Sequence, residues 1–391
     1  TGNRNPLGQL STVTYNNAGQ ISGSVDRLGR QSSFTYDAAN RLTGVTYSDA
    51  QVSYQYDAAN RLTRVDDTQD GTASWNYDTV GRLLSETMPN GVVSYTYNNA
   101  GQRTSMTVAD RAPVNYSYDS AGRLQTITQG AESFTYSHDT LSRIASLSRP
   151  NAVTTSYNYD QAGRLERLQH LNGLNQPIED YRFTYTLDDK IATITSLVNS
   201  TQLSAAKTAG AADAGNRITQ FGAAAYTFGA AGQTTSKTDA QGTTQYIWDA
   251  RGRLSRATLP GGQTVTYTYD ALGRRASRSA DGTTTSFLYD GQDVVLDRNN
   301  DGSTVDYLNG NAIDTKLRQS SAATGSLYFL PDHLGSTTAL TTANGNVAEF
   351  QQYEPFGGNN NSSLTRYGFT GRERDPSTRL IYYRARWYDP D

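Results

Sequence analysis

Short stretches in which apolar or aromatic residues alternate with polar ones recur along the chain. Residues 52–56 (VSYQY) and 265–269 (VTYTY) are two examples. An alternation of period two is typical of β-strands, and Val, Thr and Tyr suit a pleated surface. We find no convincing amphipathic helix pattern. The pattern of hydrophobic and polar positions therefore predicts an all-β protein.

The predicted strands are part of a repeat. A Tyr-Asp-x-x-Gly-Arg-Leu motif recurs, and the steps between its copies from residue 15 to residue 118 are 20 or 21 residues. Copies begin at Tyr15, Tyr36, Tyr56, Tyr77, Tyr97, Tyr118, Tyr159, Phe228, Trp248 and Tyr269. Such regularity predicts a repeat architecture. The copy near Tyr136 contains an insertion, and the register is lost at 186–227, where the small-residue stretch 205–215 predicts a long loop or an irregular turn.

Each residue of the motif suits a turn between two strands. The Asp can accept hydrogen bonds from backbone N–H groups of the turn, and the Gly or Asn tolerates a positive φ angle. The Arg can lie across a Tyr ring of a neighbouring copy or pair with its Asp. A second turn lies midway between copies, as Asp-Gly at 70–71 and Asn-Gly at 90–91. Each period is then one hairpin, and the array is a continuous antiparallel sheet of about two dozen strands.

Composition limits the possible functions. The chain has 391 residues, with 34 Lys and Arg against 37 Asp and Glu, a net charge of −3. This balance argues against nucleic acid as the main partner. Cysteine is absent, which removes disulfides, thiolate metal sites and a Cys nucleophile. No apolar run approaches the ~18 residues of a membrane span, so no transmembrane segment is expected. The chain opens with Thr1 and closes at Asp391 inside a motif, and we expect it to be an internal piece of a longer polypeptide.

Candidate catalytic residues are few. The three histidines, His138, His170 and His333, lie outside any HExxH motif, and no Ser lies in a GxSxG elbow. His333 follows Asp332, but adjacent strand residues point to opposite faces, which favours a structural histidine. Asp375 and Asp389 each precede a proline, and capping of a turn is the commoner role of this dipeptide.

Two binding alternatives also have structural explanations. Residues 297–302 match the first half of a calcium loop, but its twelfth position is Leu308, and Asp306 is a poor substitute. We favour a hairpin turn at this segment. Rows of Tyr with Asn, Gln and Thr are typical of carbohydrate-binding surfaces, but cross-strand ladders of rings explain their periodicity better. The sequence thus predicts no catalytic, cofactor-binding or metal-binding residue.

The motif copies resemble the YD repeats of Rhs proteins, of the C components of Tc toxins, of wall-associated polymorphic toxins and of teneurins. Segments at 330–336 (LPDHLGS), 353–357 (YEPFG), 369–375 (FTGRERD) and 380–390 (LIYYRARWYDP) resemble the Rhs core-associated region. The resemblance implies a long β-strip wound into a hollow shell that, in toxin members, encloses a C-terminal toxic domain. Some members cleave themselves at aspartates in a DP-x-Gly-Leu context, a segment that this sequence does not contain.

From the residues and this resemblance we expect Rhs/YD repeats over 1–310, irregular at 186–227, and a core-associated region over 311–391. The tail at 380–389 would act as a plug or cap. The strip should form a spiral or partial hollow β-shell. The expected function is a non-enzymatic shell segment of a secreted bacterial toxin, with no cofactor. Its expected partners are the C-terminal toxin domain of the same polypeptide and a delivery or secretion apparatus. An extracellular adhesion or glycan-binding module, with a cell-surface glycan as partner, and part of a self-cleaving aspartyl peptidase are the alternatives.

Overall fold

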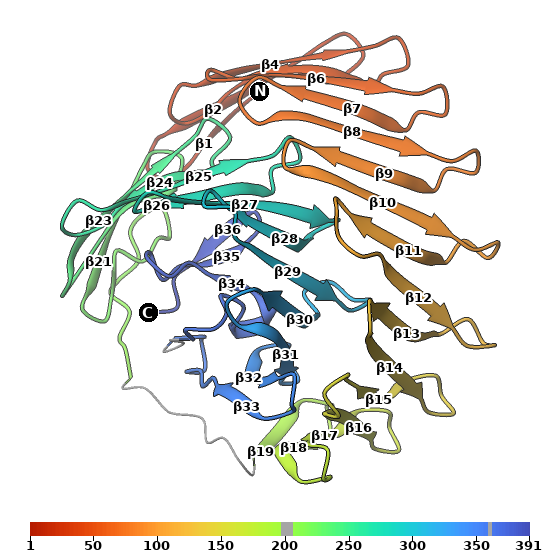
Figure 1. Ribbon diagram of the computed structural model, residues 1–391. Coiled ribbons are helices and arrows are strands. Elements are labelled where there is room, and N and C mark those ends of the chain that lie inside the picture. The colour runs from red at the N-terminus through yellow and green to blue at the C-terminus, as the bar shows by residue number, and fades with distance from the viewer. Residues whose placement is uncertain (197–205, 359–361) are drawn as a thin grey trace. The chain divides into compact units, whose positions relative to one another are not determined.

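The computed structural model describes residues 1–196, 206–358 and 362–391, and they form an almost entirely β structure, as predicted (Figure 1). The described residues contain 36 strands and one short 3-10 helix, η1 (Phe369–Gly371). The strands belong to antiparallel sheets of 19, 14 and 3 members. The predicted long antiparallel hairpin array is therefore confirmed, although its strands are divided among several sheets and exceed the expected two dozen. No described helix is long and apolar enough to cross a membrane.

The chain divides into two compact units. Unit 1 comprises the described residues of Thr1–Gly91, Ala205–Ser286 and Arg384–Trp387, and unit 2 comprises those of Val92–Ser204, Phe287–Tyr383 and Tyr388–Asp391. The boundary falls inside strands β10, β27 and β36, which contribute residues to both units.

Unit 1 contains two runs of strands in which each strand pairs with the next. The first run is β1 (Gly2–Arg4), β2 (Leu10–Tyr15), β3 (Ile21–Val25), β4 (Gln31–Tyr36), β5 (Leu42–Thr46), β6 (Gln51–Tyr56), β7 (Leu62–Asp67), β8 (Gly71–Tyr77) and β9 (Leu83–Met88). The second run is β20 (Gln220–Phe221), β21 (Ala224–Phe228), β22 (Thr234–Asp239), β23 (Gly242–Trp248), β24 (Leu254–Thr258), β25 (Thr264–Tyr269), β26 (Arg275–Ala280) and the start of β27 (Thr283–Asp290).

Unit 2 has the same organisation. Its first run is β10 (Gly91–Tyr97), β11 (Arg103–Val108), β12 (Val114–Tyr118), β13 (Leu124–Gln129), β14 (Glu132–His138), β15 (Ile144–Ser148), β16 (Thr154–Tyr159), β17 (Leu165–Leu171), β18 (Pro177–Tyr185) and β19 (Ile191–Ser196). Its second run is β28 (Asp293–Asn299), β29 (Thr304–Asn309), β30 (Lys316–Ser321), β31 (Gly325–Pro331), β32 (Thr337–Thr342) and β33 (Val347–Phe350). The short strands near the C-terminus are β34 (Glu373–Arg374), β35 (Ile381–Tyr383) and β36 (Arg386–Tyr388).

Where a repeat contains the full motif, its turn is built as the motif predicts. In the turn after β6, Asp57 Oδ1 accepts hydrogen bonds from the backbone N–H groups of Ala59 and Arg61, each at 2.9 Å. Asn60 has a φ angle of 64°, the left-handed region that Asn and Gly tolerate. The Arg61 Nε donates to Asp57 Oδ2 at 2.6 Å. The assignment of turn roles to Asp, Asn and Arg is therefore confirmed.

The same arginine also contacts the following repeat. The Arg61 Cζ lies 4.8 Å from the centre of the Tyr77 ring, and its Nη1 donates to the Asp78 carbonyl at 3.1 Å. The Tyr77 hydroxyl in turn donates to the Leu62 carbonyl at 2.9 Å. The guanidinium thus lies across the tyrosine ring of the next repeat. This is one of the two roles that the sequence predicts for the arginine. Equivalent ring contacts join Arg41 to Tyr56, Arg143 to Tyr159, Arg164 to Tyr185 and Arg253 to Tyr269.

Two details of the predicted repeat need correction. His138 takes the tyrosine position of its copy and is followed by a regular turn in which Arg143 pairs with Asp139, so there is no insertion near Tyr136. The segment 186–227 contains two further turns of the repeat type, at 186–190 and 213–217. In the second of these, Asp213 accepts from the backbone of Arg217 and pairs with its side chain. Residues 197–205, part of the expected loop, lie outside the described residues.

Apolar side chains are buried on alternate positions in strands such as β7 and β8 of unit 1, whereas consecutive residues are buried in β28, β31 and β32 of unit 2. In unit 2 a cluster of aromatic and aliphatic side chains packs around Phe329, which is 1% exposed, and includes Leu340 and Tyr367. In unit 1, Val65 and Val265 are fully buried. The run of hairpins continues past residue 310 as far as β33. The expected boundary between the repeats and the core-associated region at residue 310 stays a prediction.

The left-handed turn residue gives the first testable prediction. Replacing Asn60 with Val should lower the free energy of unfolding by about 1–2 kcal/mol, because a side chain branched at Cβ is strained at a φ of 64°. Asn60→Gly is the matched control and should leave stability nearly unchanged. Urea denaturation measures both, and equal stabilities of the Val and Gly variants would contradict the assigned role.

Candidate functional site: a polar seam in each unit

Polar side chains in each unit join residues that are far apart in the sequence. Most of the residues in contact are separated by 180 to 196 positions. Nine repeats of 20 or 21 residues span about the same length, so a repeat contacts another about nine copies away. We call these contacts the polar seam of each unit. In unit 1 it consists of Asp67, Asp70, Glu86, Asn90, Arg251, Arg253 and Arg274, and in unit 2 of Tyr95, Arg103, Arg111, Glu132, Asp290, Asp306 and Arg318.

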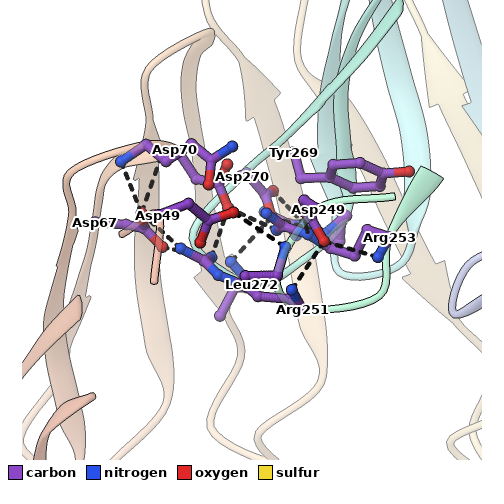
Figure 2. A network of polar contacts seen from close by, with 12 residues as sticks. Asp49, Asp67, Asp70, Asp249, Arg251, Arg253, Tyr269, Asp270 and Leu272 are labelled. Atoms are coloured by element: carbon purple, nitrogen blue, oxygen red, sulfur yellow. Dashed lines mark hydrogen bonds and ion pairs between the residues drawn. The ribbon is translucent and has the colours of Figure 1, made fainter. Parts of the chain in front are cut away.

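Figure 2 shows the centre of the unit 1 seam, where two arginines meet two aspartates. Asp67 and Asp70 come from the turn between β7 and β8, and Arg251 and Arg253 from the turn between β23 and β24. Arg251 Nη1 lies 2.6 Å from Asp67 Oδ2 and 2.7 Å from Asp70 Oδ2. Arg253 Nη1 lies 2.6 Å from Asp70 Oδ2 and keeps the pairing of its Nε with Asp249 at 2.7 Å. The Arg253 guanidinium therefore pairs with an aspartate of its own turn and also with an aspartate of the seam.

Burial strengthens the charge interactions between the arginines and the aspartates of this centre. Burial disfavours the charged form of Arg253, but its hydrogen bond and its charge interaction with Asp70 outweigh that effect and raise its pKa. Burial raises the pKa of Asp70, and the two arginines only partly offset it. Asp67 is also desolvated, yet the Arg251 side chain and two backbone N–H groups lower its pKa. The carboxylates here depend on their arginines, since a buried charge without a partner is costly.

A second contact of the unit 1 seam repeats the pattern. Arg274, the arginine of a repeat turn, lies 2.7 Å from Asp270 of its own turn and 2.6 Å from Glu86 Oε1 of β9. The side chains of Arg274 and Glu86 are each 5% exposed. The Asn90 amide donates to the Ala276 carbonyl at 3.0 Å. The two runs of strands in unit 1 are thus joined by buried ion pairs and by a side chain bonded to the backbone.

The unit 2 seam also consists of hydrogen bonds and ion pairs, but its acidic residues and its arginines come from both runs of strands. Here Asp290 in β27 accepts from Tyr95 at 2.8 Å and pairs with Arg103 at 2.7 Å. Farther along, Arg111 Nε lies 3.0 Å from Asp306, and Glu132 accepts hydrogen bonds from Arg318 and Tyr328. Seam arginines therefore come from either run of strands.

His170 is fully buried beside this seam and has only one suitable tautomer. Its Nε2 lies 2.9 Å from the Pro331 carbonyl, which can only accept, so Nε2 carries the proton. Its Nδ1 then accepts from the Thr155 hydroxyl at 2.8 Å. Thr155 in turn accepts from Arg149 at 2.7 Å. Burial, followed by the charge of Arg149, lowers the pKa of His170 to about 3. This histidine is a neutral structural group that joins β17 to β31.

The remaining candidates also have structural contacts. Asp332 and His333 lie in the turn between β31 and β32, so the argument from opposite strand faces is wrong, and both line a cavity of about 610 Å³. Asp332 Oδ1 accepts from the backbone N–H groups of Leu334 and Ser336, each at 2.8 Å. The His333 ring packs 4.9 Å from that of Phe183.

The aspartates before proline and the proposed calcium segment behave as turns. Asp375 Oδ1 accepts from Ser377 and Thr378, and Asp389 Oδ1 accepts from the Asp391 N–H. Residues 297–302 end β28 and form a hairpin turn, and Asp297 pairs with Arg366. Among the described residues, no group of three or more His, Asp or Glu side chains is arranged to hold a metal ion.

Sequence reasoning missed the seam. One signal was available: Glu86 is an acid in a strand whose neighbours are Ser, Thr and apolar residues, and Arg251 adds a second basic residue to a turn that already has Arg253. Their spacing of about nine repeats follows from the structure, because the period alone does not say which copies face each other.

Comparisons with known proteins agree with a fold built from repeated antiparallel hairpins. The family model described as the teneurin YD-shell matches residues 5–95, 90–196 and 151–391. The chain belongs to this YD-shell family. Crystal structures of TcdB2-TccC3, and of TcdB2-TccC3 without hypervariable C-terminal region, share its fold over 97% of the chain, at 15% identity and TM-scores of 0.72 and 0.74. A structure of the Photorhabdus luminescens Tc holotoxin pore matches 98% of the chain at 14% identity, with a TM-score of 0.64.

The YD-shell chain spans only part of these proteins. It covers 26% of the TcdB2-TccC3 chains and 28% of the holotoxin chain. A curated relative, the tRNA3(Ser)-specific nuclease WapA of Bacillus spizizenii, is 27% identical over 157 residues, which are 37% of this chain and 7% of the relative. The family match shows the family, and the solved structures show the fold.

The unit 1 seam gives a stability prediction. Arg274→Met should lower the free energy of unfolding by about 3–5 kcal/mol, because it removes the cation between two buried carboxylates. Adding Glu86→Gln to Arg274→Met should recover part of that loss. Arg64→Met, at an exposed ion pair, is the matched control and should leave chemical denaturation curves unchanged. An equally small effect of Arg274→Met would contradict a seam that stabilises unit 1.

The buried histidine gives a pH prediction. Below pH 6.5 the unfolded chain binds a proton at His170 that the folded chain rejects until about pH 3. The free energy of unfolding should therefore fall by about 1.4 kcal/mol per pH unit over this window. His170→Gln keeps one donor and one acceptor and should remove that contribution. The check is urea denaturation of both proteins from pH 7 to pH 4.5, and parallel pH profiles would contradict the prediction.

Proposed function

We propose that this YD-shell chain is a non-enzymatic wall segment of a secreted bacterial toxin and encloses a C-terminal cargo domain of the same polypeptide. The observation that carries the proposal is the shared fold over 97% of the chain with the TcdB2-TccC3 structures. One of those crystal structures is of TcdB2-TccC3 without its hypervariable C-terminal region, so that protein has a variable region at its C-terminal end. The similarity to part of a nuclease of the WapA type supports a toxin cargo here.

The contacts of the C-terminal segment of unit 2 support a role for this segment as the tether between the wall and a cargo. Arg366 donates to Asp297 of β28 at 2.9 Å and to Glu373 at 2.8 Å. Arg372 pairs with Asp314 and donates to the Tyr382 carbonyl at 2.8 Å. The Arg366–Asp297 pair holds the segment against β28, and the other contacts join residues within 311–391. We therefore propose residues 311–391 as a plug that fixes the point from which a cargo would start.

The proposed setting follows from the same relatives. A toxin shell of this type acts outside the cell that makes it, so we propose a secreted or extracellular location and a delivery or secretion apparatus as the second partner. The wall contributes enclosure rather than chemistry, since the polar side chains of the seam and turns are occupied by contacts within the wall.

An extracellular adhesion or glycan-binding module is the second candidate function. The name of the matching family and the rows of tyrosines favour it. The geometry of the repeat weighs against it, because repeat tyrosines such as Tyr56 and Tyr77 donate their hydroxyls to carbonyls and carry an arginine on the ring. A self-cleaving aspartyl peptidase is a third candidate, but Asp375 and Asp389 accept hydrogen bonds from the backbone of their own turns.

Limited proteolysis of the native full-length polypeptide tests enclosure. Residues that follow Asp391 should resist thermolysin in the native protein and become sensitive in the Arg274→Met variant, in which the seam is weakened. The matched Arg64→Met variant should keep the protection. Mass spectrometry of the fragments locates the cuts. The proposal fails if the following residues are cut as fast as the same segment expressed alone, or if the native chain has no residues after Asp391.

A further inference from the structure

Unit 2 contains a cavity of about 890 Å³ that neither the repeat nor the seam explains. One wall is formed by β12–β16, and the other by the loop 311–316, the end of β31 and the turn that follows it. A volume in this range suits a small organic ligand. Its apolar lining includes Leu124, Ile144, Phe329 and Leu334.

Four tyrosines line this cavity, and they fall into two classes. Tyr118 and Tyr159 occupy the motif position, and their hydroxyls donate to the carbonyls of Arg103 and Ile144 at 2.9 and 3.0 Å. Tyr136 and Tyr157 precede the motif position by two residues. Among the residues that the structure describes, the hydroxyls of these two tyrosines have no hydrogen-bond partner.

The two unpartnered hydroxyls belong to side chains that are largely removed from water, since Tyr136 is nearly buried and Tyr157 is half-buried. Tyr136 is only 9% exposed, and burial raises the pKa values of Tyr136 and Tyr157. Both groups therefore stay protonated and are donors at the cavity wall. Each hydroxyl is a donor at the cavity wall without a protein acceptor, so a ligand that supplies an acceptor would gain more in this partly desolvated place than at an exposed surface.

One buried cation near the cavity has no ionic partner among the described residues. Each charged side chain that lines it has an ionic partner, in the pairs Arg123–Asp119, Arg143–Asp139, Lys316–Asp293 and Asp314–Arg372. Arg149 interacts electrostatically with Tyr157 and Tyr136 and is 5% exposed. Its guanidinium donates to the Thr155 hydroxyl and the Phe329 carbonyl, and no described carboxylate pairs with it. A buried cation without a counterion favours an anion nearby.

We propose that this cavity binds a small aromatic carboxylate, with the ring among the tyrosines and the carboxylate accepting hydrogen bonds from the Tyr136 and Tyr157 hydroxyls. The apolar lining suits the ring, the two phenols supply charge-assisted hydrogen bonds, and the unpaired guanidinium of Arg149 compensates the ligand charge. The site is formed by unit 2 alone and does not depend on whether the shell holds a cargo.

Binding of 2-naphthoate and of its neutral analogue 2-naphthamide to the purified chain tests the proposal. Isothermal titration calorimetry should show one site for the acid and at least about tenfold weaker binding of the amide, because the amide lacks the charge that Arg149 favours. Equal affinities for acid and amide, or no heat and no ligand-observed NMR signal with the acid at millimolar concentration, would overturn it.

Two conservative variants locate the site. Tyr136→Phe and Tyr157→Phe keep the rings and should each weaken 2-naphthoate binding about tenfold, the effect expected for one hydrogen bond to a charged group. Tyr15→Phe, at a tyrosine that is 55% exposed, is the matched control and should bind as the wild type does. Circular dichroism spectra should be the same for all four proteins. Unchanged affinity in both Tyr136→Phe and Tyr157→Phe would show that these hydroxyls do not hold the carboxylate.

Discussion

The rest of the structure depends on the arginine that closes many of the repeat turns, a place that Gln20 and Gln102 take in two others. In the turn after β6 it donates to its own aspartate, donates to the carbonyl of the next turn and covers the ring of the next tyrosine. Only a planar group with several donors can make these contacts together, and a lysine ammonium has neither the plane nor the fork. The contacts hold successive hairpins together at their turns, in addition to the buried apolar side chains of the strands.

The polar seam extends the use of the same residue. Arg253 and Arg274 each keep the aspartate of their own turn and add an acid about nine repeats earlier. An acidic substitution on a strand such as β9 is therefore enough to create a long-range contact, because the repeat already supplies an oriented guanidinium. Local and long-range order are coupled through one side chain, and loss of that side chain should affect both.

The local part of this design could be predicted from the sequence, and the long-range part could not. The turn residues Asp57, Asn60 and Arg61 build the turn through contacts within five positions, so their types and spacing are sufficient to predict it. The partner of Glu86 depends on which copies face each other, and this information is not contained in one repeat. The sequence suggests an insertion at His138 because the tyrosine ring is missing there, although the position of this residue in the period is regular. The sequence also suggests a strand at Asp332 and His333, because the pattern does not mark where β31 ends.

The two aromatic positions of the repeat differ in whether their polar atom can change its hydrogen-bond partner. The motif tyrosine uses its hydroxyl and its ring for contacts between repeats, so a change there alters the wall itself. The aromatic residue two positions earlier, as at Tyr95, Tyr136 and Tyr157, is buried by its ring alone, and its hydroxyl is available for another purpose. At Tyr95 that hydroxyl joins the seam through Asp290, and at Tyr136 and Tyr157 it faces a cavity. New specificity in a wall of this kind should therefore arise at the earlier position, where a polar atom can change its partner without loss of the repeat.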